Sequence, residues 1–116
     1  MNNNIIIRQI LSKIINKTTK NEIEWKESLE SNCYEFSTSN MTVKMEKIFS
    51  NDPFETVIFY FMDNRGDVFE RADALDYFSS FEELNRFFEK VEKQVNKTDE
   101  KLNTLLNELD DISPSM

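Results

Sequence analysis

The sequence predicts a single α+β domain in which helices pack on one antiparallel sheet. Apolar residues recur at helical spacing near both ends of the chain, and they alternate with polar residues in its middle. A continuous apolar run, Val57–Met62, precedes Gly66, the one glycine in the chain. We therefore expect an N-terminal amphipathic helix, an antiparallel meander of about five short strands, and a long or broken C-terminal helix packed on the sheet.

The chain's 116 residues suit one domain that spans residues 1–116. Hydrophobic residues make up 39% of the chain and include ten Phe, which is ample for one core, so only residues 1–4 and 113–116 are expected to fray. No apolar stretch approaches the roughly 20 residues of a membrane span. The N-terminus lacks the pattern of a signal peptide, and the single Cys33 excludes an internal disulfide. We expect a cytoplasmic protein without membrane contact.

The first helix is predicted from five apolar residues at helical spacing: Ile7, Ile10, Leu11, Ile14 and Ile15. Four cations precede the first acid, Glu22, so this segment is locally basic. A basic amphipathic helix suits a membrane surface or a partner, but this one has few cations on its polar face and neither Trp nor Phe on its apolar face. Packing on the domain's own sheet is the better interpretation.

Strands are expected at Glu22–Lys26, Cys33–Phe36 and Met41–Phe49 because the hydrophobic period changes to two. Turns are expected at 38–40 and 51–53. The run Val57–Met62 predicts a fourth strand that is buried on both faces, either by helices on opposite sides or by a second copy of the chain. Gly66 falls in the hairpin that leads to a fifth strand, where a positive φ is needed.

The C-terminal helix begins at a capping box formed by Ser80 and Glu83. Its apolar positions step by three and four: Phe81, Leu84, Phe88, Val91, Val95, Leu102, Leu105, Leu109 and Ile112. One interpretation is a single helix of about eight turns whose far half projects and pairs with another chain. The other is a break near 96–98, with Thr98 capping a separate helix, and we favour the break because polar capping residues interrupt the seam there.

The net charge of −8 is unevenly placed. Residues 1–50 hold seven Lys/Arg and six Asp/Glu, a net of +1, whereas residues 51–116 hold seven and sixteen, a net of −9. An acidic surface repels phosphate backbones, so we expect no nucleic-acid binding. The same surface could attract a basic protein partner.

The residues that carry most enzyme chemistry are missing. There is no His, so the commonest general base and zinc ligand are absent, and Cys33 has no cation close in sequence to activate it. Asp63–Asp67 lacks the alternating acids of a calcium loop, and the paired carboxylates stand at turns and helix starts. One glycine cannot build a phosphate-cradling loop. We expect a non-enzymatic protein with no catalytic residue, metal or cofactor.

The chain has fourteen aromatic side chains, and most are predicted to lie in the core because large aromatic residues are highly buried on average. Three near the start of the C-terminal helix are candidates for contact with a partner: Tyr77, Phe78 and Phe87. The reason is that Phe87 and Phe88 are adjacent, and only one of two adjacent rings can follow a narrow helical seam directly. An exposed cluster of these three rings would be a plausible contact surface.

The chain resembles small uncharacterised bacterial proteins of about this size. The resemblance lies in Thr18–Trp25, the Tyr34 strand, the turn from Asp63 to Gly66, and the leucines of Lys101–Leu109. It covers most of the chain but consists of fold-level spacings, and Tyr77–Phe81 is extra. The resemblance implies a helix, an antiparallel meander and C-terminal helices, together with a bacterial or mobile-element source. It transfers no site residue.

Three functions remain open. The first is a non-enzymatic protein-binding module whose partner could be a second copy in a homodimer, suggested by Val57–Met62 and by surplus apolar surface on the C-terminal helix. The second is an acidic inhibitor, either a toxin-immunity protein or a nucleic-acid mimic, which requires acids clustered on one face. The third is a dimer like the secretion chaperones, which ranks lower because the strands form an uninterrupted meander.

Overall fold

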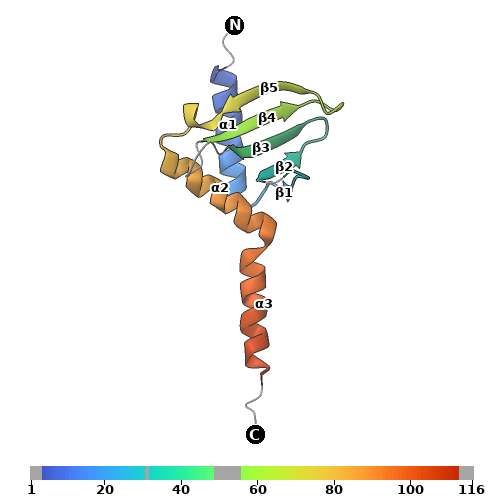
Figure 1. Cartoon of the computed structure of the whole chain (residues 1–116), viewed down its shortest axis with the longest axis vertical. Helices are drawn as coiled ribbons and strands as arrows, with labels where there is room; N and C mark the ends of the chain where they lie inside the picture. The colour runs from blue at the N-terminus through green and yellow to red at the C-terminus, as the bar shows by residue number, and fades with distance from the viewer. Residues whose placement is uncertain (1–3, 31, 49–55, 113–116) are drawn as a thin grey trace.

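The structure is a computed structural model that describes residues 4–30, 32–48 and 56–112 (Figure 1). The predicted turn at 51–53 and Phe49, the predicted end of the third strand, lie outside these residues. The elements are α1 (Asn4–Thr19), β1 (Lys26–Glu27), β2 (Cys33–Ser37), β3 (Thr42–Ile48), β4 (Thr56–Met62), β5 (Val68–Asp73), the 3₁₀ turn η1 (Ala74–Asp76), α2 (Phe81–Asn96) and α3 (Thr98–Asp110). This order confirms the predicted α+β class.

The five strands form one antiparallel sheet in the order β1-β2-β3-β4-β5. Each strand therefore pairs with the next in the chain, as the predicted meander requires. The first strand is shorter and later than expected, because only Lys26 and Glu27 pair with β2. The residues before it leave α1 through Asn21, whose φ is 58°, and place Trp25 in the core.

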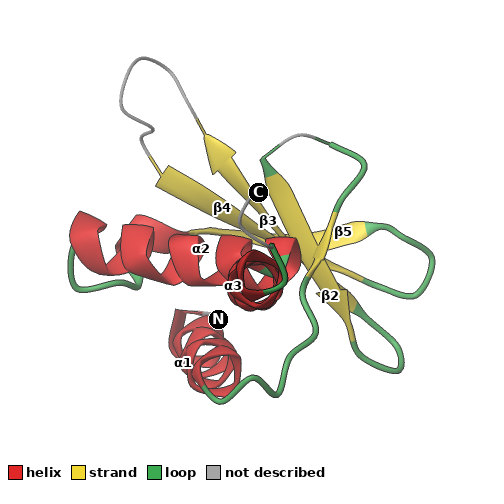
Figure 2. Cartoon of the chain, turned by 90° about the horizontal axis from the view of Figure 1, so that it is seen from below, coloured by secondary structure: helices red, strands yellow, loops and turns green. Residues whose placement is uncertain are grey.

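Both α1 and α2 lie against the same face of the sheet (Figure 2). The core between them contains Val57, Phe59 and Phe61 of β4, whereas Ile58 and Tyr60 on the other face are only half-buried. The prediction that helices on opposite sides cover both faces of β4 is therefore wrong, whereas coverage of the second face by a second copy stays a prediction. The continuous apolar run of β4 arises because the second face carries long apolar side chains and a tyrosine without a helix above them.

The β4–β5 hairpin has the turn chemistry that the sequence predicts. Gly66 has a φ of +85°, and a Cβ there would meet no atom within 4 Å, so the glycine is favoured by its backbone conformation alone. The Asp63 Oδ1 atom accepts hydrogen bonds from the backbone N–H groups of Arg65 at 2.9 Å and Asp67 at 3.0 Å. These bonds explain the acidic turn without a cation.

The C-terminal helix is broken where the capping residues indicate. Ser80 is the N-cap of α2, and its Oγ accepts the Glu83 backbone N–H at 3.1 Å, which is one of the two hydrogen bonds of the predicted capping box. Lys97 separates α2 from α3 with a left-handed φ of 53°, and no side chain caps the start of α3. The break is thus made by the backbone of Lys97 and not by a Thr98 cap.

Candidate protein-contact surfaces

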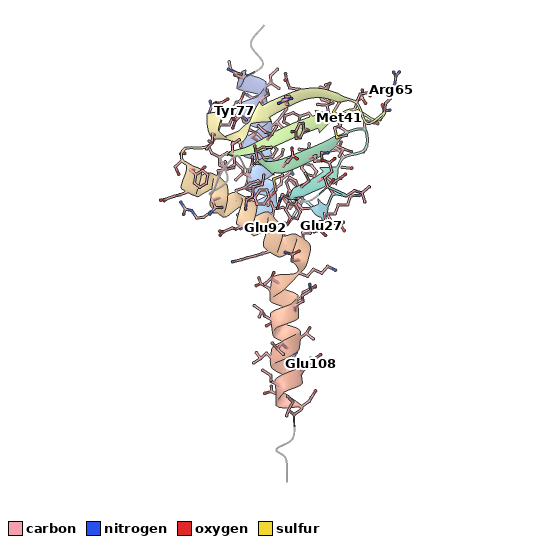
Figure 3. The ribbon with its side chains drawn as sticks, in the orientation of Figure 1. Glu27, Met41, Arg65, Tyr77, Glu92 and Glu108 are labelled. Atoms are coloured by element: carbon pink, nitrogen blue, oxygen red, sulfur yellow. The ribbon has the colours of Figure 1, made fainter. Side chains whose placement is uncertain are left out.

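The helix α3 projects away from the rest of the molecule, and its Glu108 lies far from the sheet (Figure 3). None of its residues is buried. Its apolar side chains, and that of the residue two positions after it, are between 50% and 67% exposed: Leu102, Leu105, Leu106, Leu109 and Ile112. These five side chains form the surface that we call the α3 stripe. They are large, apolar and without a partner in the described chain.

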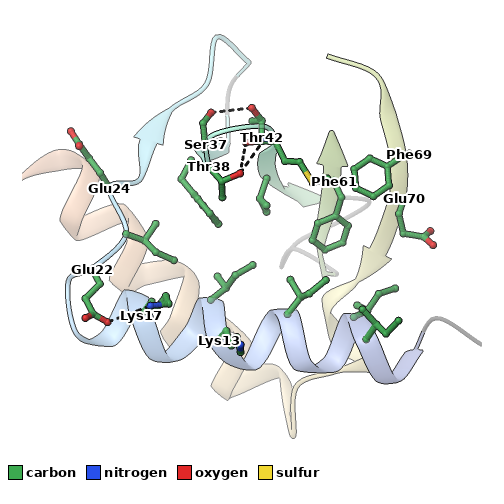
Figure 4. A pocket seen from close by; sticks show the side chains of 18 of the residues that line it. Lys13, Lys17, Glu22, Glu24, Ser37, Thr38, Thr42, Phe61, Phe69 and Glu70 are labelled. Atoms are coloured by element: carbon green, nitrogen blue, oxygen red, sulfur yellow. Dashed lines mark hydrogen bonds and ion pairs between the residues drawn. The ribbon is translucent and has the colours of Figure 1, made fainter. Parts of the chain in front are cut away.

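A second apolar surface is a groove between α1 and the sheet, with a volume of about 900 Å³ (Figure 4). Ile6 and Ile10 of α1 form one wall, and Phe61 and Phe69 contribute to the other. The groove is open because α1 reaches the core mainly through Ile7, Leu11 and Ile14, which leaves its neighbouring isoleucines exposed. We call this surface the α1 groove.

The polar side chains at the α1 groove are of mixed sign. Lys13, Lys17 and Lys26 line it together with Glu22, Glu24 and Glu70. The Lys17 Nζ and Glu22 Oε1 atoms lie 4.0 Å apart at one end, and both side chains are about half exposed, so this pair contributes little to stability. The apolar walls, not these charges, are the main feature of the groove.

The face of the sheet opposite the helices carries alternating charges. The strand register places Glu35, Lys44, Tyr60 and Arg71 side by side on neighbouring strands. The Lys44 Nζ and Arg71 Cζ atoms lie 5.8 Å and 5.9 Å from the centre of the Tyr60 ring, and the Tyr60 hydroxyl donates to Glu46 Oε1 at 2.9 Å. This face is therefore satisfied within itself and is not a uniformly acidic patch.

One group of potential metal ligands lies at the edge of that face. The ligand atoms of Glu30, Cys33 and Glu46 lie within 4.8 Å of one another. Burial, followed by the nearby carboxylates of Glu46 and Glu30, raises the pKa of Cys33 from 9.0 to about 11. The thiol therefore keeps its proton at neutral pH, and Lys44 Nζ already bonds Glu30 Oε1 at 2.9 Å. The arrangement is a poor metal site.

Two of the three aromatic residues predicted to contact a partner are buried, and the third is half-buried. Phe78 and Phe87 are buried, with their ring centres 5.7 Å apart, and Phe87 also packs 6.4 Å from Trp25. Tyr77 is half-buried beneath Arg8, and its hydroxyl donates to Asn4 Oδ1 at 3.1 Å. The expected exposed aromatic patch is therefore corrected. The buried face of α2 is wide enough to hold both Phe87 and Phe88.

The sequence did not predict the α1 groove, although Ile7, Ile10 and Ile14, which line it, are apolar positions of the predicted first helix. The available signal was the run Ile5–Ile7, because three consecutive isoleucines cannot all lie on the buried face of one helix.

Comparisons with protein-family models, curated proteins and solved structures each found no match. Among residues 4–30, 32–48 and 56–112, no helix has the length and apolar character needed to cross a bilayer.

Proposed function

We propose that this protein is a non-enzymatic, cytoplasmic protein-binding module, and that the α3 stripe is its contact surface. The observation that carries the proposal is the exposure of a leucine-rich helix. A helix of 13 residues has no buried residue, yet it presents four leucines on its surface. A partner that covers these leucines is the simplest reason for such a sequence.

The energetics favour this interpretation. An isolated helix shorter than about 12–15 residues is marginal in water, and most helical stability in proteins comes from packing an amphipathic face. Each large aliphatic side chain that becomes fully buried contributes about 1.5–3 kcal/mol. Burial of the α3 stripe against another protein would therefore both stabilise the helix and supply binding free energy.

The two alternatives receive less support. An acidic inhibitor needs clustered acids, but Glu35 and Glu46 alternate with Lys44 and Arg71 on the open face of the sheet. A dimer like the secretion chaperones is less well supported because the five strands form an uninterrupted meander. Neither alternative uses the α3 stripe.

The test compares two double variants of α3 in affinity capture from an extract of the source cells. Leu105→Asp/Leu109→Asp places two charges on the α3 stripe, where they oppose burial in an interface. We expect the amount of specifically captured protein, measured by quantitative mass spectrometry, to be at least about tenfold lower for this variant than for the wild type.

The matched control is Asn103→Asp/Asn107→Asp, which adds the same charge at the same spacing on exposed polar positions of α3. It should capture as much as the wild-type protein. Equal capture by all three proteins would contradict the proposed function. Equal loss in both variants would show that charge, and not the apolar stripe, governs binding.

A further inference from the structure

Within the described residues, the α3 stripe and the α1 groove are two apolar surfaces without a partner, and they are complementary in kind. One is a convex helical ridge, and the other is an open groove that already has a helix as one wall. We propose that the α3 helix of one copy occupies the α1 groove of a second copy. The inference rests on the proposed function and names the partner that the α3 stripe binds.

The dimensions of the two surfaces agree. Along α1 the groove extends from Ile6 to Lys17, which is about 16 Å at the helical rise of 1.5 Å per residue. The leucines of the α3 stripe from Leu102 to Leu109 extend about 10 Å by the same rise. The groove is therefore long enough to cover all four leucines. A helix laid in it would contact α1 on one side and the sheet on the other.

The net charges of the two helices are opposite in sign. Between Asn4 and Thr19, α1 has three cations and no acid, a net of +3. Between Thr98 and Asp110, α3 has four acids and one lysine, a net of −3. Two of the α1 cations, Lys13 and Lys17, line the groove. The complementarity is between the two helices and not with the groove as a whole, because the groove is lined by three lysines and three glutamates. Opposite charges on two packed helices favour the pairing and its register.

The acids at the end of α3 point to the same partner. Glu108 and Asp110 lie in its last turns, where no basic residue is present and where negative charge opposes the helix dipole. If α3 lies antiparallel to the partner's α1, these acids lie near the α1 N-terminus. That end has no acid in its first turn and carries the favourable end of its own dipole.

A second copy fits the groove better than the chain's own α3. Lys97 alone separates α2 from α3, whereas helices that double back on one another need a loop of about 2–5 residues. The structure instead directs α3 away from the sheet (Figure 1). Reciprocal exchange of α3 between two copies fills both grooves and closes the assembly as a symmetric pair.

The first experiment measures the mass of the full-length protein in solution over a range of concentrations. We expect a dimer for the wild-type protein and a dissociation constant at least about tenfold higher for Leu105→Asp/Leu109→Asp and for Ile6→Asp. The control for Ile6→Asp is Ile5→Asp. Ile5 is 68% exposed and Ile6 is 54% exposed, but only Ile6 lines the groove. Ile5→Asp adds the same charge to the first turn of α1 but outside the groove, so it should weaken the dimer less than Ile6→Asp does.

The second experiment identifies the contact. A size-tagged chain carrying Ile10→Cys is mixed with an untagged chain carrying Leu105→Cys, and a short bismaleimide is added. Cys33 is buried with a raised pKa, so the introduced thiols react first. We expect crosslinks between tagged and untagged chains, and none when Ile5→Cys replaces Ile10→Cys. Circular dichroism of each variant verifies that it is folded.

Three results would overturn the inference. A wild-type protein that is monomeric at all concentrations removes the second copy. Dimers of Ile6→Asp that are as tight as those of Ile5→Asp indicate direct pairing of two α3 helices. Crosslinks within one chain that carries both cysteines indicate that α3 folds back. In each case the proposed function stands if the Leu105→Asp/Leu109→Asp variant captures less of a protein other than a second copy. It fails if this variant captures as much as the wild-type protein.

Discussion

At the scale of single residues, Trp25 shows how one side chain joins three elements. Its ring meets Phe36 of β2 with the ring centres 4.7 Å apart, and it meets Phe87 of α2 at 6.4 Å, both edge-on. Its Nε1–H donates to the Thr18 hydroxyl of α1 at 3.0 Å, and Thr18 is fully buried. A buried indole needs such an acceptor, because an unsatisfied polar group costs about 1–3 kcal/mol.

We predict that removing either partner of this hydrogen bond destabilises the domain. Trp25→Phe and Thr18→Val should each lower the free energy of unfolding by about 1–3 kcal/mol, because each leaves a buried polar group or space behind. The double variant should lose less than the sum, by about 0.5–3 kcal/mol, since it strands neither group. Urea unfolding of all four proteins measures this coupling.

Thr19→Val is the control for this cycle. Thr19 is adjacent to Thr18 but exposed, and its hydroxyl donates to the Ile15 carbonyl within α1 at 2.9 Å. Its replacement should change the free energy of unfolding by less than about 0.5 kcal/mol. Strictly additive effects of Trp25→Phe and Thr18→Val would show that the hydrogen bond contributes nothing of its own.

At the scale of elements, α2 and α3 illustrate how one apolar seam produces two different helices. Both have leucine, phenylalanine or valine at steps of three and four. α2 buries Leu84, Phe88 and other residues against the sheet, whereas α3 buries none. The difference arises at Lys97, whose left-handed backbone turns the chain away from the sheet before the second half of the seam begins.

We predict that the domain folds without α3. A chain that ends at Lys97 should have the same free energy of unfolding as the full-length monomer within about 1 kcal/mol, because no buried contact is lost. Denaturant unfolding is measured at concentrations below the dissociation constant of the pair, so that association does not add to stability. A loss of more than about 2 kcal/mol would show that α3 packs on its own domain.

At the scale of the whole molecule, the chain is far from spherical. Its radius of gyration is 17.5 Å and its extents are 73 × 35 × 25 Å. A compact domain of this length has a radius of gyration of about 13 Å. The excess comes from α3, which extends the long axis beyond the sheet and its two helices (Figure 1). Such a shape places the α3 stripe where another molecule can reach it.

We predict that small-angle X-ray scattering of the dilute protein gives a radius of gyration near 17.5 Å. The chain that ends at Lys97 should give about 13 Å, because the remaining domain is compact. Similar values near 13 Å for both proteins would mean that α3 lies against its own domain in solution. That result would remove the reason for a partner on the α3 stripe.

The sequence by itself determined the class of the fold, the strand order, the Gly66 hairpin, the Ser80 cap and the break between the last helices. These features depend on local periodicity and backbone chemistry, which neighbouring residues supply. Only the tertiary structure decided that α1 and α2 share one face of the sheet, and that β4 is consequently half-covered.

The candidate surfaces follow the same division. The surplus leucines of α3 are visible in the sequence, because their spacing is local. The burial of Phe78 and Phe87, and the opening of the α1 groove, depend on how helices far apart in the chain pack on one sheet. Exposure is a property of that packing, and a pattern of apolar residues is the same whether a neighbouring element covers it or leaves it open.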